Sequence, residues 1–151
     1  MSDERAFVMM IKDSYWKSFV DRHQQGKQVH SYVRKGLAPP KHASLILFYV
    51  TKPVSEMAGV AEFVERKAGE AEDVWSQHGD ESVLASKGKF KEFVGDGKKA
   101  SFIRFKNLRE ASRPVSLSNA LLLLGVKRFS RKGFYIEQEV AEELLSQMGL
   151  S

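Results

Sequence analysis

The stretch that decides the fold is SLILFYV, residues 44–50, which ends in the turn sequence TKP at 51–53. A short continuous apolar run bounded by turn residues is typical of a strand buried on both faces. The segment MAGVAEFV, residues 57–64, follows directly and predicts a neighbouring strand, with Gly59 at a candidate bulge. No helix fits between the two segments, which disfavours a doubly wound parallel sheet.

Periodicity and turn residues extend this reading over the chain. We expect further strands at 7–12, 28–33, 100–105, 108–115 and 134–136, and helices at 14–26, 68–78, 83–94, 119–124 and 138–148. Ser118 is the expected N-cap of the fourth helix and Gly125 its end. The chain is therefore predicted to be an α+β protein, a small, mostly antiparallel β-barrel decorated by short helices. We find no internal boundary and treat residues 1–151 as a single domain.

Composition excludes several classes of protein. The chain has 151 residues, 42% of them hydrophobic, and no cysteine. Disulfides, thiolate nucleophiles and cysteine-based zinc sites are thereby excluded. No apolar run approaches the roughly 20 residues that span a bilayer, and the N-terminus does not resemble a secretory signal. We expect a soluble, cytoplasmic protein that does not contact membranes.

Motifs of common catalytic and cofactor sites are missing from the sequence. It contains no P-loop, no G-x-G-x-x-G, no H-E-x-x-H and no G-x-S-x-G. The four histidines, at 23, 30, 42 and 78, have no spacing typical of metal ligands. We therefore expect neither a metal nor another cofactor.

Charge is strongly segregated along the chain. The net charge is +5, yet residues 22–55 hold six basic and no acidic residues, whereas residues 56–81 hold two basic and eight acidic ones. Residues 82–132 are again basic, with thirteen Lys or Arg against three acids. Two basic blocks of this kind can create a field that attracts polyanions, although solvated surface lysines and arginines fit the same counts.

Two local segments combine basic and aromatic residues. In GKQVHSYVRKG, residues 26–36, alternation places His30, Tyr32 and Arg34 on one face of a predicted strand. Such a face can stack on a base and bind a phosphate, although a solvated strand with tyrosine at a barrel rim fits equally well. The segment VKRFSRKGFY, residues 126–135, carries four basic residues that suit phosphate contacts. Its phenylalanines, like the two tryptophans of the chain, are expected in the core.

The order of these features resembles the PUA-like superfamily and, within it, the ASCH and EVE domains. The resemblance rests on the Gly26-Lys27 turn and strand ending at Arg34 (similar to G-x-K-x-x-E-x-R), LILFYVTKP at 45–53, GVAEFVE at 59–65, and GFY at 133–135 before a C-terminal helix. It covers residues 7–149, and an uncharacterised archaeal family of the superfamily is the most similar.

This resemblance implies a pseudobarrel that binds RNA, or secondarily DNA, in a basic cleft between the barrel and its helices. By position it implies cleft residues Lys27, His30, Tyr32, Arg34, Tyr49 and Lys52. The charge pattern adds phosphate contacts from Lys35, Lys98, Lys99, Arg104, Lys127, Arg128, Arg131 and Lys132.

Two alternative functions remain, one prompted by a difference between this sequence and the family motif and the other by the charge pattern. The glutamate of the family motif has no counterpart here, because residues 22–55 contain no acid. Some ASCH-type proteins resemble small amidohydrolases that use a Lys, a Thr and a Glu. With His30 as a substitute base, Lys27 and Glu62 would serve as the proton-transfer groups of a hydrolase that acts on a modified nucleoside. We rank this hydrolase below nucleic-acid binding because the threonine hydroxyl is missing. The other alternative is a protein-interaction module whose acidic stretch, residues 56–81, contacts a basic partner beside an exposed apolar patch.

Overall fold

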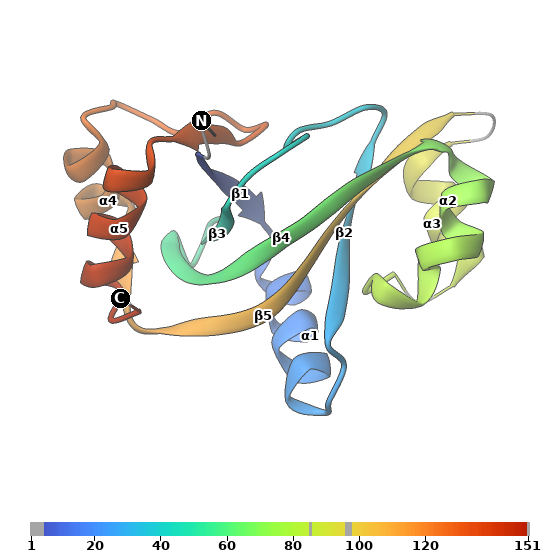
Figure 1. Ribbon diagram of the computed structural model, residues 1–151, viewed down its shortest axis with the longest axis horizontal. Coiled ribbons are helices and arrows are strands. Elements are labelled where there is room, and N and C mark those ends of the chain that lie inside the picture. The colour runs from blue at the N-terminus through green and yellow to red at the C-terminus, as the bar shows by residue number, and fades with distance from the viewer. Residues whose placement is uncertain (1–4, 85, 96–97, 151) are drawn as a thin grey trace.

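The computed structural model describes residues 5–84, 86–95 and 98–150, and these form six strands, five α-helices and one 3₁₀ turn (Figure 1). The strands are β1 (Ala6–Ile11), β2 (Val29–Lys35), β3 (Leu45–Val50), β4 (Glu56–Glu70), β5 (Lys99–Ser116) and β6 (Phe134–Ile136). The helices are α1 (Asp13–Gln24), α2 (Ala71–His78), η1 (Gly79–Glu81), α3 (Lys87–Val94), α4 (Leu117–Leu124) and α5 (Gln138–Gln147). None of the helices in these ranges has the length and apolar character needed to cross a membrane.

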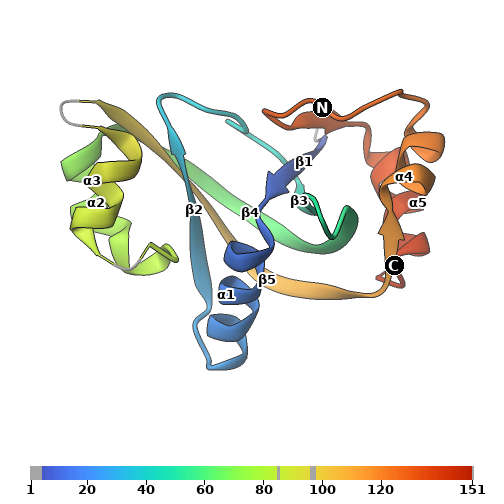
Figure 2. The same ribbon diagram turned by 180° about the vertical axis from the view of Figure 1, so that it is seen from behind.

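All six strands belong to one mixed sheet with the order β2-β5-β4-β3-β1-β6. β1 and β3 run parallel, and the other four pairs are antiparallel. The α+β class agrees with the sequence, but the predicted barrel is not found in the described ranges, because the edge strands β2 and β6 lie at opposite ends of the sheet and do not pair with each other. The curvature comes from β4 and β5, whose pairing shifts register at three places, since each such irregularity bends and twists a strand (Figure 2).

β4 and β5 are longer than predicted. β4 continues past residue 64 to Glu70, and β5 is one strand where two were predicted. In the extended part Lys67 lies opposite Phe102, so α2 begins only at Ala71. α3 follows the turn η1 and begins at Lys87, also later than expected. The polar composition of this part fits a strand pair because one face of an antiparallel sheet can be solvated.

Each group of helices covers a different part of the sheet. α1 packs on its centre, where the Trp16 ring lies 5.1 Å from that of Phe48. α2 and α3 lie at one end of the molecule, where Trp75 stacks on Phe90 at 4.8 Å, and α4 and α5 lie at the other (Figure 1). Both tryptophans are packing residues, as predicted. Phe129 also packs against the core beside α4 and α5, as predicted.

The sequence correctly predicts the end of α4 and the irregularity of the sheet at Gly59, but it places the N-cap of α4 at Ser118 instead of Ser116. Gly125, at φ 68°, ends α4 as predicted, but the N-cap is Ser116, whose hydroxyl accepts a hydrogen bond from the Asn119 N–H at 3.2 Å. Gly59 lies at a register irregularity of the sheet, as predicted. A side chain there would collide with the ring of Trp16, which explains why glycine is needed.

Candidate nucleic-acid interface

A groove at the end of β2 brings together residues from both basic blocks. Its volume is about 390 Å³, and its lining residues are Tyr32, Val33, Arg34, Lys35, Leu37, Ala38, Pro39, Phe93 and Lys132. We call it the β2 groove. Three of these side chains are cationic, and no carboxylate is among them. The Lys35 ammonium lies 5.1 Å from the centre of the Phe93 ring, and Leu37 is 62% exposed. The groove therefore combines a positive rim with accessible apolar surface.

Internal hydrogen bonds fix two of the predicted residues in the groove wall. The Tyr32 hydroxyl donates to the Met10 carbonyl at 3.2 Å, and Arg34 Nη1 donates to the Pro39 carbonyl at 2.7 Å. Burial raises the pKa of Tyr32 and lowers that of Arg34. A tyrosine with a raised pKa is neutral near pH 7, so the groove wall adds no negative charge. Tyr32 and Arg34 thus shape the groove more than they project into it.

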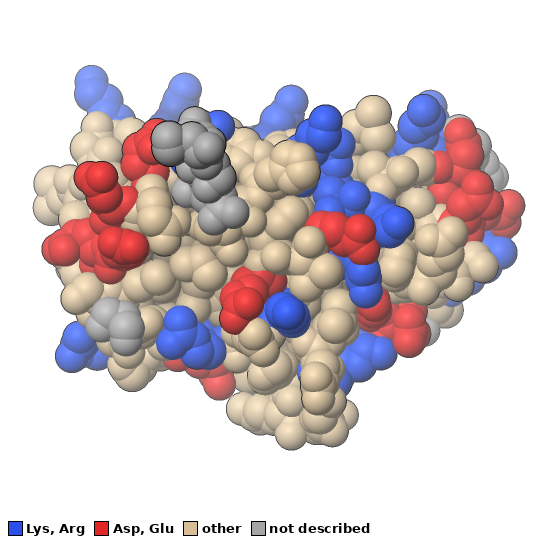
Figure 3. Space-filling model, in the orientation of Figure 1, with Lys and Arg blue, Asp and Glu red and all other residues tan. Residues whose placement is uncertain are grey.

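The segment between α4 and β6 carries the four basic residues of the stretch 126–135. Lys127, Arg128 and Arg131 are exposed there, beside Lys132 of the groove. Within the described residues none of these four side chains forms an ion pair. Figure 3 shows Lys and Arg side chains projecting along the upper edge of the molecule. In the same view of Figure 1, the α4–β6 and β2–β3 connections run along that edge.

Two other grooves are acidic. One, of about 380 Å³, lies between α1 and the sheet and is lined by four carboxylates, from Asp13, Asp21, Glu56 and Glu110, against the single cation Lys17. The other, of about 400 Å³ beside α2, holds Glu70, Glu72 and Asp73 together with Lys91 and Lys98. Both repel a polyanion more than the β2 groove does.

His30 is buried, although the sequence suggested a place in the interface. Its ring lies 5.4 Å from that of Phe105 and 5.7 Å from that of Phe19, and its Nε2 is 3.3 Å from His23 Nδ1. Burial first, and then the nearby His23 and Arg22, lower the pKa of His30 to about 4. A neutral imidazole with no exposed surface offers nothing to a nucleic acid, so we leave His30 out of the interface.

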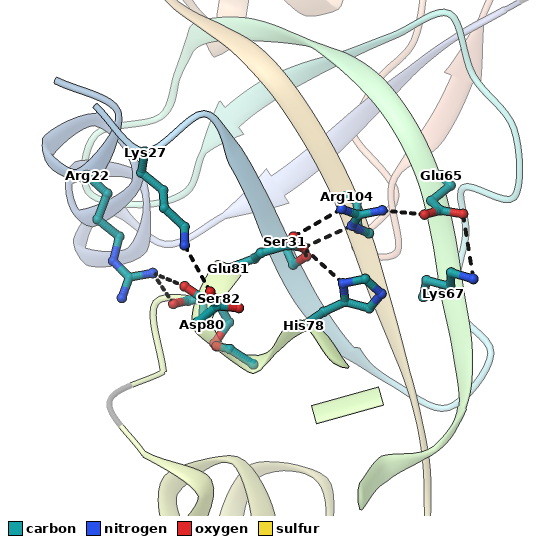
Figure 4. A network of polar contacts seen from close by, with 11 residues as sticks. Arg22, Lys27, Ser31, Glu65, Lys67, His78, Asp80, Glu81, Ser82 and Arg104 are labelled. Atoms are coloured by element: carbon teal, nitrogen blue, oxygen red, sulfur yellow. Dashed lines mark hydrogen bonds and ion pairs between the residues drawn. The ribbon is translucent and has the colours of Figure 1, made fainter. Parts of the chain in front are cut away.

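Two predicted interface residues, Lys27 of the implied cleft and the phosphate contact Arg104, are engaged in a polar network around the turn that links α2 to α3 (Figure 4). Arg104 donates to both carboxylate oxygens of Glu81, at 2.9 and 3.0 Å, and also to Glu65. Lys27 Nζ lies 3.2 Å from Asp80 Oδ2. Arg104 is only 17% exposed and is committed to this network, so it is not available for phosphate.

Glu81 is the anchor of the network. It also accepts a hydrogen bond from Ser31 at 2.8 Å and lies 3.4 Å from His78 Nδ1. Burial raises its pKa, but hydrogen bonds from Arg104 and Ser31 and the charge of Arg104 outweigh this effect, and the net shift is downward. Glu81 is therefore ionised near pH 7 and holds the helical segment against β2 and β5.

The remaining predicted residues lie apart from the β2 groove or beneath the surface. Tyr49 is buried, with its ring 5.1 Å from that of Phe129. Lys52 is exposed in the turn after β3. Lys98 and Lys99 are exposed at the start of β5, and Lys98 lines the acidic groove beside α2.

The hydrolase constellation is not assembled in this structure. Lys27 contacts Asp80, whereas Glu62 accepts a hydrogen bond from Asn107 at 2.6 Å. His30, the substitute base, is buried among aromatic rings. Within the described ranges, no three acidic or histidine side chains are placed to hold a metal ion.

The exposed apolar patch expected beside the acidic stretch is also not found in the described part of the chain. The large apolar residues exposed there are Leu37, Val64, Leu122 and Val126; of these four Val64 alone lies in the stretch 56–81, and none lies on α2, so they form no patch beside it. Leu37 and Phe93, which line the β2 groove, were not predicted as site residues. Phe90 and Phe93 lie about one helical turn apart on α3, and of the two only Phe90 is fully buried.

Comparison with known proteins identifies the fold. No protein-family model matches the chain, and no curated protein matches it in sequence. The crystal structure of ASCH from Zymomonas mobilis is similar, with a TM-score of 0.72 and 20% identity over 93% of this chain and 94% of that one. A variant of the same protein gives a TM-score of 0.78 and 20% identity over 97% and 98%. Rpa0253 from Rhodopseudomonas palustris gives 0.54 and 10% identity over 97% and 94%.

Proposed function

We propose that this chain, which has the fold of an ASCH protein, binds RNA through the β2 groove and the basic segment beside it. The resemblance to ASCH domains seen in the sequence implies RNA as the partner, and DNA is the nearest alternative. The observation that carries the proposal is the meeting of the two basic blocks. Arg34 and Lys35 come from the first, and Lys132 from the second, about a hundred residues later in the chain.

The groove has the components that a nucleic acid needs. Lys35 and Lys132 supply mobile ammonium groups for phosphate oxygens, and Arg131 lies next to Lys132 in the sequence. Leu37 and Phe93 offer apolar surface to a base or sugar. Because no carboxylate is among the described residues that line the groove, an approaching phosphate meets attraction from these side chains without repulsion.

Salt dependence tests the proposal. Each phosphate contact releases counterions, so the logarithm of the affinity falls by about 0.7 to 0.9 per contact for each tenfold rise in salt. We expect the binding of a short fluorescent RNA, followed by anisotropy between about 50 and 200 mM salt, to show a clear negative slope. The double variant Arg131→Ala/Lys132→Ala is expected to flatten this slope by about two contacts.

Lys17→Ala is the control for the loss of each positive charge. It also removes an exposed lysine, but that lysine lines the acidic groove beside α1 and pairs with Asp13. It should leave the slope unchanged. A wild-type affinity that does not depend on salt, or a Lys17→Ala variant that flattens the slope by about one contact, would contradict the proposal. The same titration with DNA of equal sequence separates the two nucleic acids.

A further inference from the structure

The β2 groove runs along an open edge of the sheet. Four consecutive residues of β2, 32–35, line it. Because the side chains of a strand point alternately to opposite faces, a groove on one face would be lined by every second residue. Tyr32 packs with the cluster that contains α1, whereas Val33 packs with the cluster that contains α2 and α3, so residues of both faces border the groove. The groove therefore lies at the edge of β2, between the two faces.

The backbone hydrogen bonds of β2 show which residues point to this edge. Gly36, which follows the strand, donates its N–H to the Lys99 carbonyl at 2.8 Å. The register pairs Lys35 with Ala100, so Gly36 and Lys99 form a hydrogen-bonded pair that continues the ladder. Bonded and non-bonded pairs alternate in an antiparallel sheet. The N–H and carbonyl groups of Val33 and Lys35 consequently point away from β5.

This edge has no strand partner in the described ranges. β2 is the terminal strand of the sheet, and no loop in those ranges forms a backbone hydrogen bond with it. Val33 is only 7% exposed, which limits the access of water to its N–H and carbonyl groups. Backbone polar groups with little access to water are nearly always paired in proteins. An occupant of the groove that supplies both a donor and an acceptor would pair them.

The wall that faces this edge has its own hydrogen bonds. The Ala38 N–H donates to Ser101 Oγ at 3.0 Å, and the Ala38 carbonyl accepts from Arg66 at 3.1 Å. The Pro39 carbonyl accepts from Arg34 at 2.7 Å. These bonds hold the segment 37–39 in place, so its backbone does not pair with β2, and the volume of about 390 Å³ stays open to another chain.

Charge decides which chain fits. The groove is lined by the cations Arg34, Lys35 and Lys132, and no carboxylate is among its described lining residues. A second copy of β2 at this edge would bring the same cations together, and like charges on paired strands are destabilising. Lysine on an edge strand discourages such self-association. A peptide that carries carboxylates has the complementary charge.

We propose that an extended acidic peptide of a partner protein binds the β2 groove as an added strand. Its backbone pairs with the N–H and carbonyl groups of Val33 and Lys35, and its carboxylates contact Lys35 and Lys132. Addition of a strand to an exposed sheet edge is a common mode of peptide recognition. The peptide occupies the place that the proposed function gives to RNA, so the two ligands compete. This competition rests on the proposed function, whereas the peptide site does not.

The test uses a short fluorescent peptide of alternating glutamate and valine with blocked ends, and its binding is followed by anisotropy. We expect the wild type to bind it. The same peptide methylated at every backbone nitrogen keeps its charge but cannot donate to the edge. It should bind about tenfold more weakly, because the hydrogen bonds to the Val33 and Lys35 carbonyls are lost.

Two substitutions of one residue separate the backbone from the charge. Lys35→Ala removes the ammonium group and keeps the N–H, whereas Lys35→Pro removes both. Because this N–H points away from β5, proline deletes no hydrogen bond of the sheet. Lys35→Pro should bind the peptide about fivefold more weakly than Lys35→Ala. No binding by the wild type, an equal affinity for the methylated peptide, or equal affinities of the two variants would overturn the proposal.

The methylated peptide is tested on the wild type, so the proposal stays testable if proline disturbs the end of β2. Both measurements are made without RNA, and their failure therefore leaves the proposed function intact. Addition of RNA to the peptide complex tests the competition, and we expect RNA to displace the peptide. Simultaneous binding of both ligands would overturn the competition and the place of RNA in the groove, while the peptide site would stand.

Discussion

Replacing the buried imidazole of His30 by an aliphatic side chain, His30→Leu, should flatten the pH dependence of stability between about pH 7 and pH 5. The pKa of His30 is about 4 in the folded protein, against the ordinary value of 6.5. In this window the unfolded chain therefore takes up a proton that the folded protein excludes. The stability of the wild type is full above about pH 6.5 and falls as the pH decreases toward 4.

The size of the effect follows from these two values. At pH 5 the imidazole of the unfolded chain is almost fully protonated, whereas that of the folded protein is about one-tenth protonated. The free energy of unfolding of the wild type should thus decrease by roughly 2 kcal/mol between pH 7 and pH 5 from this group alone. The lowered pKa of Glu81 places its titration below this window, so it does not mask the effect.

The assay is urea unfolding at both pH values, followed by the fluorescence of Trp16 and Trp75. His30→Leu should lose most of the decrease whatever its stability at pH 7. His42→Gln is the matched control, because His42 is exposed, and it should keep the decrease seen in the wild type. A wild-type free energy that does not change with pH, or an equal decrease in His30→Leu, would refute the reasoning.

Two further substitutions test the packing around the site. Arg104→Ala should lower the free energy of unfolding by about 3 kcal/mol in urea titrations, because Glu81 is largely buried and would lose its bidentate partner; a loss under about 1 kcal/mol, typical of an exposed pair, would show that the network does not anchor the turn. Gly59→Ala should cost about 1–3 kcal/mol, measured as a lower melting temperature, because its methyl group collides with Trp16; an unchanged melting temperature would contradict the tight contact.

Local chemistry accounts for what the sequence could predict. The apolar run at 44–50 is a buried strand, and Gly125 ends a helix, because burial and backbone conformation at these positions depend on neighbouring residues. The two basic segments were also visible. Their charge pattern led to Lys35 and Lys132, which line one groove in the structure.

Long-range pairing accounts for what the sequence could not predict. Lys27 and Asp80 are 53 residues apart, and nothing local indicates that one neutralises the other. The alternation at His30, Tyr32 and Arg34 fixes a common face but not its burial, which depends on the packing of α1 against β2 and β5. Phe93 enters the groove only because α3 packs beside β2.

The most direct test of the central claim is ultraviolet crosslinking of bound RNA, with the crosslinked peptides identified by mass spectrometry. If the two basic stretches form one RNA-binding groove, crosslinks will fall on residues 32–39, on 127–132 and on Phe93. Crosslinks confined to α1 and to residues 110–114, which line the acidic groove, would contradict it.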